Sequence, residues 1–357
     1  MISGRLFTLI FGICLMLWLS AGHPASAHNS VAPAEDIPPA GTPVGHSPFE
    51  RAVGPTIVNR GSALYDFTSF KLDSEDGKRH YWVQIGIPKR AAPPRGFPVL
   101  YMVDGNAAMG LIDESTLEAL DILSAPVLVA LGYDTYARVD TMSRALDYTP
   151  PVMQDGQPIT PIVRGRPGGG ADAFAKLIER EIKPRVEQLA QIDRQRQTLW
   201  GHSYGGLFTL YMLHAHPADY QAYVAGDPSL WYHDGELVDD LLATSQGSLS
   251  GKSVRVMRGA GHSAAGSDKS RLQQRKTRRH QFSPSGDAPR LPDTSRGRSP
   301  MPNVMEKVVT ALRKAGADVH YRRFPELSHG EMMQASLLPA LILAARPNLV
   351  DAANSAE

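Results

Sequence analysis

The sequence predicts an α/β fold, with a mostly parallel central sheet, helices on both of its faces and an antiparallel N-terminal hairpin at one edge. From residue 97 onward, short apolar runs typical of buried strands alternate with longer runs typical of helices. Strands that are apolar along their whole length are typical of parallel sheets covered on both sides. Two earlier strand-like runs, separated by a turn, predict the hairpin.

The hairpin comes first in the chain. Residues 64–72 (LYDFTSFKL) and 80–88 (HYWVQIGIP) contain several aromatic and β-branched side chains, and the linker between them contains Asp76-Gly77, a dipeptide that favours tight turns. The strands expected after the hairpin lie at 97–105, 125–133, 196–203, 220–228, 252–261 and 318–327. The expected helices lie at 115–123, 171–190 (with a kink at Pro184), 205–216, 235–245, 301–317 and 330–345.

The first 27 residues have the layout of a secretory signal peptide. Arg5 precedes an uncharged apolar run at 6–19, and the small residues Ala25 and Ala27 stand before His28 as at a cleavage site. The apolar run is shorter than the ~20 residues that a transmembrane helix needs, although a retained N-terminal anchor is the alternative. We therefore expect a secreted, periplasmic protein with no transmembrane anchor after cleavage.

Composition excludes several kinds of chemistry. The only cysteine, Cys14, lies within the apolar run, so a protein cleaved after Ala27 would have no disulfide, thiolate nucleophile or cysteine-ligated metal. A net charge of +1 gives no general attraction to nucleic acid. Neither the histidine spacing of a metalloprotease nor the glycine spacing of a phosphate-binding loop is found. We expect no metal and no cofactor.

Three regions are expected after the signal peptide. Residues 28–60 are rich in Pro, Ala and Gly and predict a tail that is at most partly ordered. Residues 61–348 then form one domain. A basic segment at 262–300 interrupts the alternation of strands and helices. It is either a solvated flexible insertion or a basic lip that attracts an anionic ligand or surface.

A serine between two glycines predicts a nucleophile. Gly201, Ser203 and Gly205 lie between an apolar strand and a helix, which is the setting of a nucleophile elbow. The serine backbone is strained there, and a Cβ on either glycine would collide across the turn. The turn also puts Ser203 at a helix N-terminus, where the amides favour negative charge.

A serine nucleophile needs a base and an oxyanion hole. His329 lies in the short loop between the last expected strand and the last expected helix, and we expect it to pair with Ser203. The backbone amide of Tyr204, directly after the serine, is one candidate oxyanion donor. The amide of Asn106, in the Asp-Gly-Asn loop after an early strand, is the second, although this loop could be an ordinary turn.

The acid that would orient His329 is not evident. It is expected after the strand at 252–261, where the first carboxylate is Asp268, inside the basic segment, followed by Asp287 and Asp293. Glu326 would reach the histidine only if its loop folds back. The alternatives are Asp268 as the acid, or a serine–histidine dyad with a backbone carbonyl in the third position.

Five stretches carry a resemblance to a known family: FPVLYMVDGNAAM, GGGADAFAKLIEREIKPRVE, LWGHSYGGLFTLYML, AGDPSLWY and FPELSHGEMMQASLLPAL. They resemble the α/β-hydrolase esterases of the esterase-D-like group. They are most similar to the periplasmic esterases of trilactone catecholate siderophores such as enterobactin and salmochelin. The resemblance covers roughly residues 60–260 and 301–345, and it departs from the family at the basic segment.

The resemblance implies a serine hydrolase that opens the trilactone backbone of a free or ferric siderophore. Ser203 would be the nucleophile, His329 the base, and Tyr204 and Asn106 the oxyanion donors. A serine–histidine pair without a clear acid also resembles that subgroup. Two alternatives stay open. One is a general carboxylesterase or a feruloyl, acetyl or thioester hydrolase, and the other is a non-catalytic binding protein on the same fold.

The resemblance also points to two binding residues. SRALDYTP is similar to the family's Arg-x-x-Asp-Tyr-Thr-Pro stretch, so Arg144 is either a structural partner of Asp147 or faces the anionic catecholates. Trp231, in PSLWY, either lines the acyl or catechol pocket or is a core aromatic residue.

Overall fold

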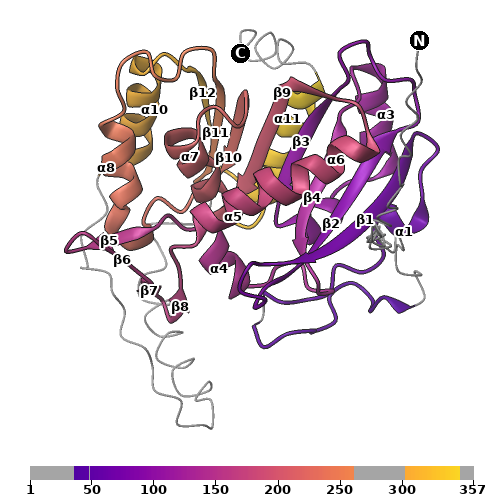
Figure 1. Cartoon of the computed structure of the whole chain (residues 1–357), viewed down its shortest axis with the longest axis horizontal. Helices are drawn as coiled ribbons and strands as arrows, with labels where there is room; N and C mark the ends of the chain where they lie inside the picture. The colour runs from indigo at the N-terminus through magenta and orange to yellow at the C-terminus, as the bar shows by residue number, and fades with distance from the viewer. Residues whose placement is uncertain (1–35, 48, 261–301, 346–357) are drawn as a thin grey trace, which may run out of the picture.

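The computed structural model describes residues 36–47, 49–260 and 302–345 (Figure 1). The predicted signal peptide at 1–27 and the basic segment at 262–300 lie outside the described residues. The described part of the chain forms an eight-stranded sheet in the order β1-β2-β4-β3-β9-β10-β11-β12, together with two small hairpins. The strands of the large sheet are β1 (Tyr65–Asp73), β2 (His80–Pro88), β3 (Phe97–Val103), β4 (Val127–Tyr133), β9 (Ile192–His202), β10 (Ala222–Gly226), β11 (Ser253–Gly259) and β12 (Asp318–Phe324). The small hairpins consist of β5 (Val152–Gln154) with β6 (Gln157–Ile159) and β7 (Ile162–Val163) with β8 (Arg166–Pro167).

The fold class expected from the sequence is confirmed. Strands β1 and β2 pair antiparallel at one edge of the sheet, and β2 continues antiparallel against β4. From β4 through β12 every neighbouring pair is parallel. The carboxyl ends of these strands therefore meet at one edge of the sheet, where catalytic groups of α/β folds gather. The hairpins β5-β6 and β7-β8 were not expected from the sequence.

Helices cover both faces of this sheet. The described helical segments are α1 (Ile57–Arg60), α2 (Gly105–Met109), α3 (Glu114–Ile122), α4 (Ser143–Asp147), α5 (Ala171–Leu177), η2 (Ile178–Ile182), α6 (Lys183–Leu189), α7 (Tyr204–Ala215), η3 (Tyr232–Gly235), α8 (Glu236–Leu242), α10 (Val304–Lys314) and α11 (Met332–Ala345). Side chains of α1, α2, α3 and α11 share one core cluster. Side chains of α4 to α8 and of α10 share the other. Most strands of the sheet supply both clusters, because alternate residues point to opposite faces, whereas β2 supplies only the second.

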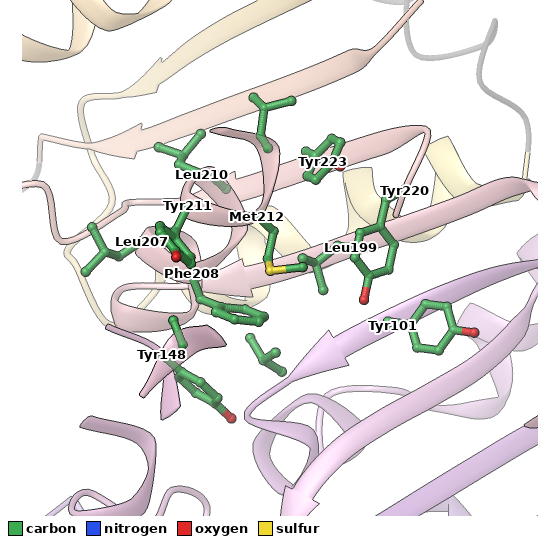
Figure 2. Packing of buried hydrophobic residues seen from close by; sticks show 14 of the residues in the cluster. Tyr101, Tyr148, Leu199, Leu207, Phe208, Leu210, Tyr211, Met212, Tyr220 and Tyr223 are labelled. Atoms are coloured by element: carbon green, nitrogen blue, oxygen red, sulfur yellow. The ribbon is translucent and has the colours of Figure 1, made fainter. Parts of the chain in front are cut away.

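Helix α7 lies directly behind the serine turn and is buried over its first ten residues. Figure 2 shows its side chains Phe208 and Met212 among Leu199 of β9 and the ring of Tyr148. The rings of Phe208 and Tyr148 are 5.9 Å apart between centroids. A helix packed on all sides holds its N-terminus rigidly, so the residue that precedes α7 is held firmly as well.

The helix expected at 171–190 is divided into three pieces. A single π-helical turn, η2, separates α5 from α6, and Pro184 is the second residue of α6. Proline has no N–H to donate to the residue four positions earlier, so the regular hydrogen-bond pattern cannot pass through it. The sequence predicts a kink at Pro184; the structure has a π-helical turn, η2, directly before the helix that contains this proline.

Part of the expected N-terminal tail contacts the domain. Within 36–60, short bridges join Pro43 to Arg51 and Ala52 to Ala137, and the amide of Val53 donates to the carbonyl of Tyr136 at 3.1 Å. This segment therefore packs against the loop after β4. None of the helices in the described ranges has the length and apolar content that a membrane span requires.

Candidate active site

The turn at Ser203 is a strained elbow between β9 and α7. Ser203 has φ 61° and ψ −115°, a region that residues other than glycine rarely adopt. Its amide donates to the carbonyl of Gly226 at 2.9 Å. A Cβ added to Gly201 would lie 2.2 Å from the carbonyl oxygen of Gly205, and one added to Gly205 would lie 2.7 Å from Val103. Both glycines are therefore required by space, as expected from the sequence.

His329 reaches Ser203 from the loop between β12 and α11. Its Nε2 lies 3.0 Å from the Ser203 hydroxyl. The loop is shaped by Glu331, whose carboxylate accepts from the amide of Ser328 at 2.8 Å and from its hydroxyl at 2.5 Å. The structure thus brings together the serine and the histidine that the sequence suggested as a pair.

The acid beside His329 is Asp227. Its Oδ2 lies 2.6 Å from His329 Nδ1, which is the distance of a charge-assisted hydrogen bond. Asp227 directly follows β10, has φ 41°, and donates its amide to the carbonyl of Met257 at 2.7 Å. Because a carboxylate can only accept, Nδ1 carries the proton and Nε2 is left as an acceptor for the serine hydroxyl.

This arrangement corrects the expectation about the acid. The acid was expected after the next strand, β11, and the carboxylates there, Asp268, Asp287 and Asp293, lie outside the described residues. His329 Nδ1 is already occupied by Asp227, so neither Glu326 nor a backbone carbonyl is needed in that position. The missed signal was the carboxylate in AGDPSLWY, which ends the strand adjacent to the serine strand.

Ser229 is a further hydroxyl at the site. Its buried Oγ lies 3.2 Å from that of Ser203, and its amide donates to the Ser203 carbonyl at 3.1 Å. Nothing in the sequence analysis had singled it out. Within the described part of the chain, the Ser203 hydroxyl therefore has two hydrogen-bond neighbours, Ser229 and His329, and of these His329 is the base.

The two expected oxyanion donors both lie at helix N-termini. Tyr204 is the first residue of α7, and Asn106 is the second residue of α2. The Asn106 side chain donates to the carbonyls of Tyr133 and Thr135 at 3.0 and 2.6 Å and accepts from the amide of Tyr133 at 3.0 Å. These bonds fix α2 to the end of β4 through the Asn106 side chain. The backbone amides in the first turn of a helix have no acceptor within that helix, so they can donate to another group.

Arg144 has a different partner from the one suggested by the sequence. It forms a two-pronged ion pair with Asp104, at 2.8 and 2.7 Å, and not with Asp147. Burial opposes the charge of Arg144, but the Asp104 carboxylate outweighs it and raises the arginine's pKa. The side chain is only 12 % exposed, so Arg144 braces the loop after β3 and does not face solvent.

Asp147 belongs to a separate buried network. It pairs with Arg79 at 2.9 Å and accepts hydrogen bonds from the hydroxyls of Tyr81 and Tyr133, both at 2.9 Å. Burial raises the pKa of Asp147 to about 7 even though these partners favour its charged form. The network holds α4 against β2 and β4.

Trp231 lines a cavity beside the triad. The cavity has a volume of about 320 Å³, and its lining includes Asp227, Trp231, Val238, Arg258, Met305 and His329. Trp231 is 37 % exposed, so it is not a core residue. Its ring lies 5.8 Å from that of Tyr204, and the Arg164 guanidinium stacks 3.6 Å from the Trp231 centroid. The cavity thus has an aromatic wall, and its lining includes one arginine, Arg258, together with the carboxylates of Asp227, Asp234 and Asp239.

The chain is similar to known esterases. A family model described as "Putative esterase" matches residues 74–282. The apo-salmochelin esterase of Escherichia coli O6:H1 is 35 % identical over 298 residues, which cover 83 % of this chain and 84 % of that protein. The ferri-bacillibactin esterase BesA of Bacillus subtilis is 37 % identical over 169 residues, which cover 45 % of this chain and 58 % of that protein.

Among solved structures, the enterobactin and salmochelin hydrolase IroE superposes with a TM-score of 0.62 at 32 % identity. The alignment covers 82 % of this chain and 100 % of IroE. The family model matches more than half of the chain, and the salmochelin esterase aligns with most of it. The chain therefore belongs to this esterase family and is an ester-hydrolysing enzyme with the α/β-hydrolase fold.

Proposed function

We propose that this enzyme is a serine esterase that hydrolyses the ester backbone of a trilactone catecholate siderophore through an acyl-Ser203 intermediate. The observation that carries the proposal is the chain of contacts from Asp227 through His329 to Ser203, at 2.6 and 3.0 Å, on a strained elbow. Its occurrence in a chain 35 % identical to an apo-salmochelin esterase supports the substrate class.

Acylation begins when Ser203 attacks the ester carbonyl. His329 Nε2 accepts the hydroxyl proton as the Ser203 oxygen bonds to the carbonyl carbon. The imidazolium that forms is stabilised by the Asp227 carboxylate on Nδ1. Negative charge on the carbonyl oxygen is stabilised by the amides of Tyr204 and Asn106. The tetrahedral intermediate then collapses, and His329 gives its proton to the departing alkoxide.

Deacylation repeats the same steps with water. The His329 imidazole removes a proton from a water molecule, whose oxygen attacks the acyl carbon, and the histidine then returns the proton to the Ser203 oxygen. Because the same base acts in both halves, one histidine held between one acid and one serine is sufficient. Asp227 makes the proposed machinery a triad, whereas the resemblance alone had suggested a dyad.

The cavity supports an acyl group that carries an aromatic ring. Trp231 can stack a catechol ring, and Arg258 in the cavity wall and Arg164 over Trp231 supply positive charge for catecholate oxygens. Arg144, by contrast, is held by Asp104 and is not proposed as a siderophore ligand.

Product analysis tests this function. The enzyme is incubated with enterobactin and, in parallel, with p-nitrophenyl butyrate and a feruloyl ester, and products are identified by mass. We expect linearised and shorter dihydroxybenzoylserine products, formed with a higher kcat/KM than either simple ester. Preference for the simple esters would indicate a general carboxylesterase. Absence of turnover of any ester by a folded protein would indicate a binding protein.

We also propose that the enzyme works in the periplasm after removal of residues 1–27. The support is the sequence pattern of Arg5, the apolar run at 6–19 and the small residues before His28. Expression with the native N-terminus, followed by fractionation and N-terminal mass analysis, should find a chain that begins at His28 in the periplasmic fraction. An uncleaved chain in the membrane fraction would support the retained anchor instead.

A further inference from the structure

The residue before the nucleophile, His202, contacts the loop that carries the base. It is the last residue of β9 and is buried, with 7 % of its surface exposed. Its Nε2 lies 2.7 Å from the backbone carbonyl oxygen of His329. The two imidazole rings also face each other, with centroids 4.8 Å apart and planes inclined by 40°. The nucleophile strand is thus joined to the main chain of the catalytic base.

This contact matters because packing alone does not hold His329 in place. The His329 side chain is 58 % exposed, so no enclosing wall determines its position. Asp227 orients the imidazole ring, but a ring can be presented correctly only if its own main chain stays fixed. The bond from His202 acts on that main chain, at the same residue, and connects it to the rigid end of β9.

The chemistry of the contact defines the state of His202. The His329 carbonyl can only accept, so Nε2 of His202 carries a proton and donates. Burial, and then the proximity of His329, lower the pKa of His202 to about 3. The charged and titratable groups that face it are His329 from the β12–α11 loop, Arg144 from α4 and Asp227 from the loop after β10.

A neutral His202 also suits the proposed reaction. His329 becomes an imidazolium during acylation, and a second cation 4.8 Å away would oppose that charge. A neutral donor holds the loop without this repulsion. A lysine or arginine in the same place would supply a donor together with the unfavourable charge.

We propose that His202 is a positioning residue that fixes the main chain of His329 against the nucleophile strand by donating its Nε2–H to the His329 carbonyl. The proposal rests on the proposed serine-esterase function, and it deepens that function by adding a residue that acts through the base without touching the substrate.

The test compares variants that keep or remove the donor. His202→Gln keeps an N–H at about the reach of Nε2, while His202→Phe keeps a ring without a donor, and His202→Met is a second variant without a donor. His214→Phe is the matched control, because His214 lies at the far end of α7. For each variant, kcat and KM for p-nitrophenyl butyrate, the rate of fluorophosphonate labelling and the melting temperature are measured.

The donor hypothesis predicts a specific pattern. His202→Phe and His202→Met should lower kcat and the labelling rate by about 10- to 100-fold, the cost of a misplaced catalytic group, with KM changed less than about threefold. His202→Gln should recover most of both rates, and His214→Phe should resemble the wild type. A merely structural histidine would lower the melting temperature equally in all three His202 variants, without rescue by glutamine.

Two results would overturn the inference: wild-type rates in both variants that lack the donor, or equal losses in His202→Gln and His202→Phe. Neither would affect the proposed function, because the wild-type enzyme would still label. Failure of the wild-type enzyme to react with the fluorophosphonate would instead refute the serine mechanism itself.

Discussion

Replacing Asp227 with asparagine tests the triad most sharply, because the side chain keeps its shape and loses its charge. The carboxylate lies 2.6 Å from His329 Nδ1. A charge pair at that separation is worth about 1.6 kcal/mol at the dielectric constant of water and about 6 kcal/mol at an effective constant of about 20. An exposed imidazole beside a mostly buried carboxylate belongs in the lower half of that range.

We therefore expect Asp227→Asn to remove ~2–4 kcal/mol of transition-state stabilisation, which corresponds to a loss of about 30- to 1,000-fold in kcat/KM. An asparagine that turns its amide nitrogen toward Nδ1 would also favour the wrong tautomer of His329 and add to the loss. KM should change little, because Asp227 acts on the base.

The assay is steady-state hydrolysis of p-nitrophenyl butyrate and of enterobactin, with the melting temperature measured in parallel. Glu326→Gln is the matched control, since Glu326 is a carboxylate three residues before His329 in the same loop. It should retain activity within about twofold, as expected for an exposed surface substitution. If Asp227→Asn keeps more than a third of wild-type activity, the reasoning fails and the enzyme works as a dyad.

Three further predictions concern the surroundings of the triad. Arg144→Met should leave the Asp104 carboxylate buried without its partner and lower the free energy of unfolding by ~3–5 kcal/mol in urea titrations; a loss below about 1 kcal/mol would contradict the bracing role. Asp147 has a pKa of about 7 when folded and about 3.9 when unfolded, so the native state binds the extra proton between these values and stability should fall as pH rises from about 4 to about 7. Asp147→Asn should flatten that part of the stability curve, and an unchanged curve would assign the dependence to another group. Trp231→Ala should raise KM about tenfold for a dihydroxybenzoylserine ester while leaving that for an acetyl ester nearly unchanged, since only the acyl group with an aromatic ring loses a stacking partner; equal effects on both esters would argue against an aryl subsite.

Local patterns were enough to predict that Ser203 and His329 lie together. A serine between two glycines, with a buried strand before it and an apolar helix after it, has few structural solutions, because each glycine is required by a specific close approach. His329 could be located because it follows the last strand expected along the chain. The parallel sheet could be predicted because its strands are apolar along their whole length.

Asp227 could not be assigned because its role depends on distance in space and not in sequence. Asp227 and His329 are separated by 102 positions, and they meet because β10 lies between β9 and β11 in the sheet. The acid was expected after β11, whereas the carboxylate of Asp227 directly follows the preceding strand, β10. The same reasoning explains Arg144, whose partner Asp104 is 40 positions away. The sequence suggested only Asp147, three positions away, or the anionic catecholates as its partner.

The central claim is that ester hydrolysis passes through an acyl group on Ser203, and acid-quench mass analysis tests it most directly. The enzyme is mixed with excess enterobactin, quenched in acid before turnover is complete and digested, and the peptide that contains Ser203 is weighed, with Ser203→Ala as the control. We expect the wild-type peptide to gain the mass of the opened siderophore, and the variant to show neither the adduct nor product. Hydrolysis by folded Ser203→Ala at the wild-type rate, without any adduct, would contradict the account.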